Sequence, residues 1–320
     1  MKRFKNILLM CDFGVKQRLA VERATSLARQ NDAQLTVITV VKDIPSEMSM
    51  AITAVPPDEL LKQAMDEQQQ KLDALVNEMK QQGVKAKSVV TSGTPFLEVI
   101  RKVLRDEHDL VILAAEGKGG IRERLFGSTS MHLIRKCPCP VWVVKPAKRT
   151  KYKKVMASVD VTNDFPGDKN RKLLNPMIVE LASSLARMDG SQFHVVQVWS
   201  VYGEGYMQVR GNMGDEALHE LRNRTKQEYA SRIDHLLAGV DLEGITTHRH
   251  MPRNMDVPKA IVKLAKDKAI DLLVMGTVCR TGLPGFIIGN TAEKVLSEVN
   301  CSVLTVKPEG FVTPVTLGDK

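Results

Sequence analysis

The sequence predicts an α/β protein made of two tandem, doubly wound parallel sheets of five strands each, a Rossmann-like arrangement. Short apolar, β-branched runs alternate with amphipathic stretches of helical spacing along all 320 residues. The pattern restarts near the middle of the chain, and V-W-V-V-K-P, ending at Pro146, returns as V-L-T-V-K-P, ending at Pro308. Strands that alternate with helices form parallel sheets through right-handed crossovers, with helices on both faces.

The first half supplies one complete set of these elements. Strands are expected over residues 6–11, 35–41, 86–91, 109–115 and 140–144, and helices over residues 18–29, 58–80, 96–105 and 128–136. In each helix the apolar residues recur at spacings of three and four, which places them on one face. Asp58 is expected to cap the long helix, because its carboxylate accepts hydrogen bonds from free N–H groups.

The second half repeats the set. Strands are expected over residues 154–159, 193–199, 245–250, 270–275 and 302–306, and helices over residues 173–188, 215–238, 257–266 and 290–299. A charged stretch without apolar periodicity, residues 147–151, separates the halves. We therefore expect domains over residues 1–149 and 150–320, each long enough to bury its own core.

Composition favours a cytoplasmic protein. Five cysteines form an odd, sparse set, and the apolar run at the N-terminus stops at Asp12, too early for a secretory signal. No apolar segment approaches the ~20 residues that a membrane span needs. The net charge of +9 favours anionic partners in general, although a merely basic surface also accounts for it. With only 4% aromatic residues, nucleic acid is not the expected partner.

Two glycine-bearing loops carry the strongest functional signal. In the second half, a buried strand leads through Gly276 to Gly289-Asn290-Thr291 and then to a helical pattern. At the same spacing, the first half runs from Ala114 to Gly127-Ser128-Thr129. Such a loop lets the backbone approach a ligand, and free N–H groups at the helix start favour a phosphate.

At this spacing the sequence resembles the universal stress protein family, and in particular its tandem two-domain members. Nucleotide-binding members carry Gly, two residues, Gly, nine residues and then Gly-Ser or Gly-Thr after the fourth strand. The resemblance implies strand order 3-2-1-4-5 in each half, an adenine-nucleotide alpha-hydrolase-like sheet, and halves that pack as a pseudo-dimer through their fifth strands. It also implies adenine nucleotide, ATP with its Mg²⁺, as ligand, and a homodimer as a further possible assembly; no other metal is expected.

The resemblance also implies the site residues. In members that bind ATP, an aspartate after the first strand and a valine in the second hold the adenine end; these match Asp12 with Val40, and Asp160 with Val198. The remaining matching positions are Ala114, Gly117, Lys118, Gly127, Ser128 and Thr129 in the first half, and Gly276, Cys279, Arg280, Gly289, Asn290 and Thr291 in the second.

The departures from the motif leave alternatives open. Ala114 and Cys279 replace glycines, and a Cβ costs roughly 1–2 kcal/mol where positive φ is required. Asn290 is expected to keep a capping side chain. The first loop is preferred, yet both loops could be inherited scaffold turns. Lys118 and Arg280 either pair with a phosphate or are solvated. Asp12 and Asp160 either bind the polar edge of a ligand or cap a neighbouring helix.

The predicted function is that of a cytoplasmic stress-response protein that binds an adenine nucleotide in at least one half, without dedicated catalysis. No phosphate-binding G-x-x-x-x-G-K-[ST] loop or G-x-S-x-G elbow is present, so at most slow ATP hydrolysis or autophosphorylation is expected. The alternative is an interaction scaffold, or a binder of hydrophobic ligands through the segment from Met48 to Val55. Cys137-Pro138-Cys139 is interpreted as packing, and His248-Arg249-His250 as an exposed strand end.

Overall fold

The computed structural model describes residues 4–14, 17–43, 56–115, 126–147, 149–162, 169–209, 211, 213–277 and 288–318. The first half contains β1 (Asn6–Met10), α1 (Arg18–Asn31), β2 (Gln34–Val41), α3 (Pro57–Gln81), β3 (Lys85–Ser92), α4 (Pro95–Asp106), β4 (Leu110–Ala114), α5 (Ser128–Lys136) and β5 (Val141–Val144). The second half contains β6 (Lys154–Ser158), α6 (Lys169–Asp189), β7 (Gln192–Val196), α7 (Glu204–Val209), α8 (Asp215–Ala238), β8 (Thr247–His250), α9 (Val257–Asp267), β9 (Leu272–Gly276), α10 (Asn290–Glu298) and β10 (Ser302–Val306).

The strands form one ten-stranded sheet in the order β3-β2-β1-β4-β5-β10-β9-β6-β7-β8. Each half therefore has the expected order 3-2-1-4-5, and the doubly wound α/β fold is confirmed. Within each half the neighbouring strands are parallel, whereas β5 and β10 pair antiparallel, with Leu304 beside Trp142. The expected pairing through the fifth strands is thus present, and it makes the carboxyl ends of the two sets of strands face opposite edges of the sheet.

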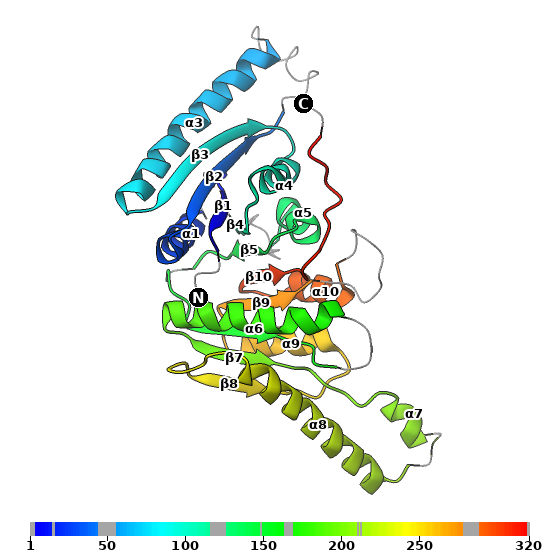
Figure 1. Cartoon of the computed structure of the whole chain (residues 1–320). Helices are drawn as coiled ribbons and strands as arrows, with labels where there is room; N and C mark the ends of the chain where they lie inside the picture. Colours follow the sequence, from blue (N-terminus) through cyan, green and yellow to red (C-terminus); the bar gives the residue numbers. More distant parts are fainter. Residues whose placement is uncertain are drawn as a thin grey trace.

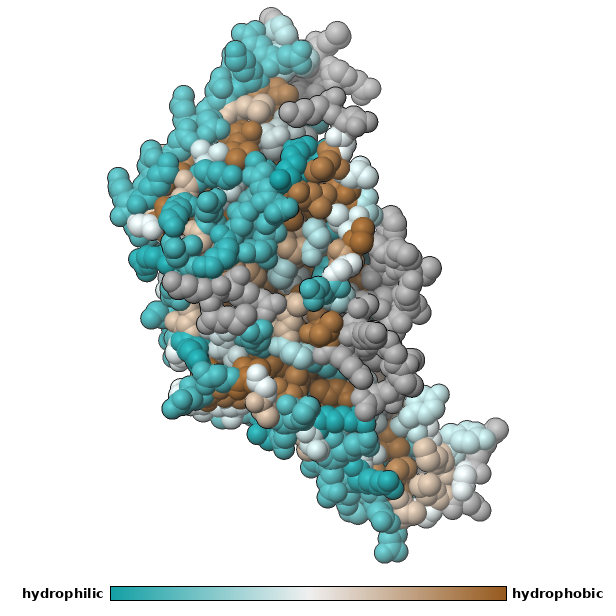
Figure 2. Space-filling view, in the orientation of Figure 1, coloured by the Kyte–Doolittle hydropathy of each residue, from teal (hydrophilic) through white to brown (hydrophobic). Residues whose placement is uncertain are grey.

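Helices cover both faces of the sheet (Figure 1). On one face α1, α3, α6 and α8 pack on a single apolar cluster, and on the other face α4, α5, α9 and α10 pack on a second. Both clusters take residues from both halves, because alternate residues of each buried strand point to opposite faces. Figure 2 shows hydrophilic residues over the outer surfaces of α3 and α8.

After β10 the chain leaves the second half and runs along α5 and α4 of the first (Figure 1). Arg101 Nε donates to the carbonyl of Thr316 and Arg105 Nη2 to that of Leu317, both at 3.4 Å. Val315 packs against the second apolar cluster. The C-terminal segment therefore ties the two halves together in addition to the sheet.

Several local expectations differ from the structure. The N-cap of α3 is Pro56, so Asp58 lies within the first turn and its predicted capping role is wrong. The short helix α7 was not expected from the sequence, since its six residues are too few to show a period. Among the described helices, none combines the length and the apolar composition that a membrane span requires.

Candidate functional site

In both halves, an acidic turn follows the first strand. Oδ1 of Asp12 accepts from the N–H of Gly14 at 2.9 Å, and Oδ1 of Asp160 accepts from the N–H (3.2 Å) and the hydroxyl (2.6 Å) of Thr162. These bonds order the turn itself. The N-cap of α1 is Gln17, so Asp12 does not cap that helix.

An amide side chain holds the backbone of each acidic turn by hydrogen bonds. Gln17 accepts from the N–H of Asp12 at 2.9 Å and donates to the carbonyl of Met10 at 3.1 Å. Asn175 likewise accepts from the N–H of Asp160 at 3.1 Å and donates to its carbonyl at 2.7 Å. Sequence reasoning missed both amides, because Gln17 lies just before α1 and Asn175 lies inside α6, so their positions do not correspond in the repeat.

The sheet brings each aspartate to its expected valine. The register of β1 on β2 and of β6 on β7, continued two residues past β1 and β6, sets Asp12 beside Val40 and Asp160 beside Val198. Asp12 is exposed and Val40 is half-buried, whereas Val198 is only 6% exposed. An apolar side chain next to an acceptor is therefore more accessible in the first half.

The first motif position ends a strand in both halves. Ala114 is the last residue of β4 and Gly276 the last of β9, so both have extended backbones and neither needs positive φ. A Cβ on Gly276 would lie 2.5 Å from Cδ2 of Leu174 in α6. Glycine at position 276 therefore leaves room for the side chain of Leu174 in α6. Ala114 adopts its backbone conformation without steric strain.

The helices after the two loops begin without a side-chain cap. Their N-caps are Gly127 for α5 (φ −76°, ψ −178°) and Gly289 for α10 (φ −61°, ψ 141°), and neither has a side chain that accepts from the first turn. Asn290 is the first residue of α10, so its predicted capping role is wrong. N–H groups left without a side-chain acceptor at a helix start favour an anion.

The start of each helix presents similar surfaces. Ser128 and Asn290 are exposed, and Thr129 and Thr291 are half-exposed. The N–H of Gly289 donates to the carbonyl of Thr277 at 3.2 Å, which places the start of α10 at the end of β9. The other predicted loop residues, Gly117, Lys118, Cys279 and Arg280, lie outside the described residues, as does the segment from Met48 to Val55.

Lys307 is a further group at the second loop that sequence reasoning did not single out. Its ammonium donates to Thr277 Oγ1 and to the carbonyl of Arg135, each at 3.3 Å, and the residue is 8% exposed. Burial lowers the pKa of Lys307 to about 8. The repeated V-K-P motif marked the position, but only tertiary packing buries it.

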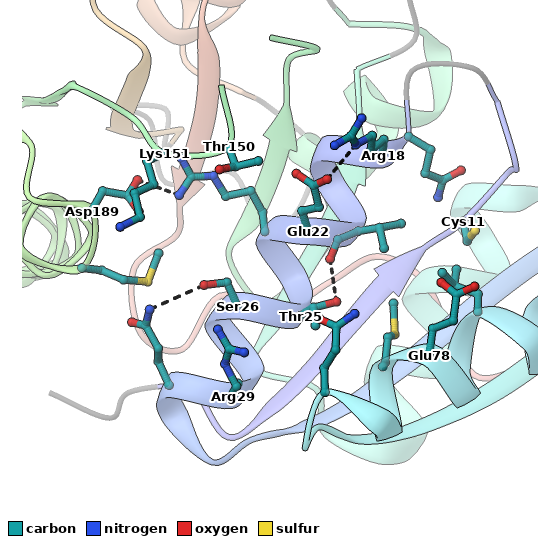
Figure 3. Close-up of a pocket in the computed structure, with 18 of the residues that line it drawn as sticks. Cys11, Arg18, Glu22, Thr25, Ser26, Arg29, Glu78, Thr150, Lys151 and Asp189 are labelled. Carbon is teal, nitrogen blue, oxygen red and sulfur yellow. Dashed lines mark hydrogen bonds and ion pairs between the residues drawn. The ribbon is translucent and has the colours of Figure 1, made fainter. Parts of the chain in front are cut away.

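A groove on the first half lies elsewhere. It has a volume of about 720 Å³ and runs along α1, between the end of α3 and the segment that joins the halves (Figure 3). None of the twelve predicted binding residues that the structure describes lines it. Two of its cations already have partners, Arg18 with Glu22 and Arg23 with Asp189. We therefore do not assign the ligand site to this groove.

Two side-chain clusters carried other interpretations. Cys137 and Cys139 are buried, as packing predicts. His248 and His250, in contrast, are half-buried, and both rings stack on His194, with centroids 4.7 and 5.2 Å away, so they are not a simple exposed strand end. Over the described part of the chain, no group of three or more His, Cys, Asp or Glu side chains is arranged to hold a metal ion.

The strand order defines the class of the fold: the chain is a doubly wound α/β protein, and ligand sites in such folds lie at the carboxyl edge of the sheet. The chain belongs to the universal stress protein family, whose model matches residues 3–145 and 175–307. The second matched segment begins after Asp160, so that aspartate lies outside it.

Relatives match over the whole length. The chain is 28% identical to universal stress protein E of Salmonella typhi and of Escherichia coli K12, covering 100% of this chain and 99% of each relative. Among solved structures, a functionally unknown protein of Pseudomonas aeruginosa PAO1 aligns with a TM-score of 0.70 at 21% identity, over 97% of this chain and 95% of that one. A universal stress protein of Archaeoglobus fulgidus aligns with a TM-score of 0.59 at 17% identity, over 95% and 99%. These likenesses confirm the fold.

Proposed function

We propose that this chain is a cytoplasmic stress-response protein that binds an adenine nucleotide, ATP with its Mg²⁺, in at least one half, and that the first half is the better binder. The observation that carries the proposal is the placement of Asp12, Val40 and the uncapped start of α5 around the carboxyl edge of the same parallel sheet. The motif spacing of the family supports the same choice of ligand.

The residues present in the first half fit such a ligand. Val40 offers apolar surface to a base, and the exposed carboxylate of Asp12 accepts from N–H or O–H groups at the nucleoside end. N–H groups of the first turn of α5 and the hydroxyl of Ser128 donate to phosphate oxygens. Bound Mg²⁺ would neutralise part of the phosphate charge.

The two halves differ in ways that favour the first. Oδ1 of Asp160 accepts two hydrogen bonds from Thr162, whereas Oδ1 of Asp12 accepts one from Gly14. Val198 is more deeply buried than Val40. A ligand in the second half therefore meets a more occupied carboxylate and less accessible apolar surface.

The test compares two matched variants, Gly127→Val and Gly289→Val. Both glycines have negative φ and extended backbones, so the backbone accepts valine, and we expect its side chain to crowd the helix start. We expect Gly127→Val to weaken ATP binding in calorimetry by at least about tenfold, a loss of ~1.4 kcal/mol, and Gly289→Val to weaken it less.

Mass spectrometry of whatever the purified wild-type chain releases on denaturation identifies a co-purified ligand directly. The opposite ranking of the two variants would assign the site to the second half. If no nucleotide is released and no heat of binding is measured at ~1 mM ATP, the Kd for ATP is above the millimolar range. That result would contradict the proposal and favour the scaffold alternative.

A further inference from the structure

The corner between α5 and β5 holds two thiols in contact. Sγ of Cys137 and Sγ of Cys139 are 3.5 Å apart, and the side chains are 0% and 9% exposed. Pro138 and Pro140 flank Cys139, and each proline ring restricts its own φ to about −65°. The corner is therefore stiff, and the sulfurs stay close to one another.

The second half provides an internal comparison for this corner. Between α10 and β10 the corresponding residues are Val299-Asn300-Cys301-Ser302. Val299 ends its helix with φ −68° and ψ 143°, close to the φ −68° and ψ 133° of Cys137, and it is also buried. The fold thus forms the same corner with one sulfur and no proline, so packing alone does not require the dithiol.

The surroundings of the two sulfurs are unequal. The hydrogen bond with Cys137, followed by burial, raises the pKa of Cys139 well above its usual value, so Cys139 keeps its proton. Burial lowers the pKa of Lys307, and the neighbouring Cys137 acts on it in the opposite direction. Among the described residues, no carboxylate forms an ion pair with Lys307; its ammonium donates to a carbonyl and a hydroxyl and lies 4.3 Å from the centre of the Phe311 ring. The charged group that acts on Cys137 is therefore a cation, whereas the carboxylate of Asp109 acts on Cys139, so we assign the attack on peroxide to Cys137.

We propose that Cys137 and Cys139 form a thiol redox site, which hydrogen peroxide converts to an intramolecular disulfide. The Cys137 thiolate attacks one peroxide oxygen and breaks the O–O bond, giving a sulfenic acid and, after protonation of the leaving hydroxide, water. The Cys139 sulfur then attacks the sulfenic sulfur, forming the S–S bond and releasing a second water. Two thiols lose two electrons and two protons, and one peroxide becomes two waters.

The geometry requires only a small movement. The sulfurs must approach from 3.5 Å to about 2.05 Å, the length of a disulfide bond. The corner leads directly into β5, which pairs with β10 across the two halves. A disulfide would therefore constrain the backbone next to β5, the strand that joins the two halves through β10.

The test uses the full-length chain, reduced, freed of reductant and then exposed to hydrogen peroxide. Remaining thiols are alkylated at intervals, and the peptides are identified by mass spectrometry. We expect the peptide with Cys137 and Cys139 to lose two hydrogens and to become resistant to alkylation. This change should be at least about ten times faster than the oxidation of Cys301, because Cys137 has a second, resolving thiol in contact with it.

Cys137→Val is the matched variant, because it installs the residue that the second half carries at this position. We expect it to fold and to leave Cys139 as slow to oxidise as Cys301. Lys307→Met should slow disulfide formation several-fold without changing the rate at Cys301. Oxidation of Cys137 and Cys139 to separate sulfinic acids, or at the rate of Cys301, in the wild-type chain would overturn the proposal.

Discussion

Three histidine rings meet on the outer strands of the second half. His194 of β7 lies beside His248 of β8 in register, and its Nδ1 is 2.9 Å from Nε2 of His250. Burial, followed by the nearby charge of His250, lowers the pKa of His194 to about 4. His248, Lys154 and Lys268 act in the same direction, so each charged group around the ring opposes its protonation.

This arrangement predicts acid sensitivity. The folded-state pKa of His194 is depressed from 6.5 to about 4. Between these two pH values the ring is protonated in the unfolded chain but stays neutral in the folded chain. Above about pH 6.5, His194 should cause no change in the free energy of unfolding with pH. As the pH falls from about 6.5 toward 4, the free energy of unfolding should decrease. By pH 5 the loss should be roughly 1–2 kcal/mol, measured by denaturant unfolding at several pH values.

His194→Gln removes the titrating ring and should flatten this part of the pH profile. His219→Gln, on the exposed surface of α8, is the matched control and should keep the wild-type slope. An unchanged slope in His194→Gln would show that other groups cause the acid sensitivity.

Between elements, a buried ion pair connects α1 of the first half to α6 of the second. Arg23 Nη1 lies 2.6 Å from Asp189 Oδ2, and the two side chains are 3% and 4% exposed. The same carboxylate oxygen accepts from the N–H of Tyr152 at 2.8 Å, and the guanidinium carbon of Arg23 lies 3.7 Å from the centre of the Tyr152 ring. Removing either charge leaves the other buried and unpaired.

Arg23→Ala should therefore lower the free energy of unfolding by about 3–5 kcal/mol. The double variant Arg23→Met with Asp189→Leu should recover much of the loss, because no isolated charge remains. Arg18→Ala on the same helix removes an exposed pair with Glu22 and should leave stability unchanged. Equal stability of the Arg23→Ala and Arg18→Ala variants would contradict the structural role of the buried pair.

Most elements were predictable because their signals are local. Short apolar, β-branched runs predicted all ten strands, and helical spacing predicted the longer helices. The strand ends placed Asp12 and Asp160 at the carboxyl edges. Helix starts were less predictable: Asp58 and Asn290 have capping chemistry, but the N-caps are Pro56 and Gly289. Residue type gives a preference for a cap, whereas the path of the preceding chain decides which residue occupies that position.

Across the whole molecule, the two halves share one sheet and both apolar clusters. Trp142 of β5 is fully buried beside Leu304 of β10, and the C-terminal segment lies on α4. A separated first half would expose β5 as an unpaired apolar edge, which favours association with another strand. The division into domains at residues 149 and 150 is our proposal, and it gives the place to separate the halves.

Chains of residues 1–149 and 150–320 produced together should copurify as a one-to-one complex. The first chain produced alone should self-associate through β5, because the edge normally covered by β10 is free. Size-exclusion chromatography with light scattering measures both outcomes. Two independent monomers would show that the junction contributes little to stability.

Local sequence patterns are enough to predict the class of fold, the repeat and the order of elements, because periodicity and turn residues act over short stretches of chain. The fifth-strand pairing was expected only from resemblance to a family. Tertiary structure decided which distant groups meet: Arg23 with Asp189, 166 positions apart, and His194 with His250, 56 apart. It also decided that the two candidate sites face opposite edges of the sheet. Such contacts depend on how faces pack, and the pattern of apolar residues specifies which face is buried but not which charged or polar partner lies against it.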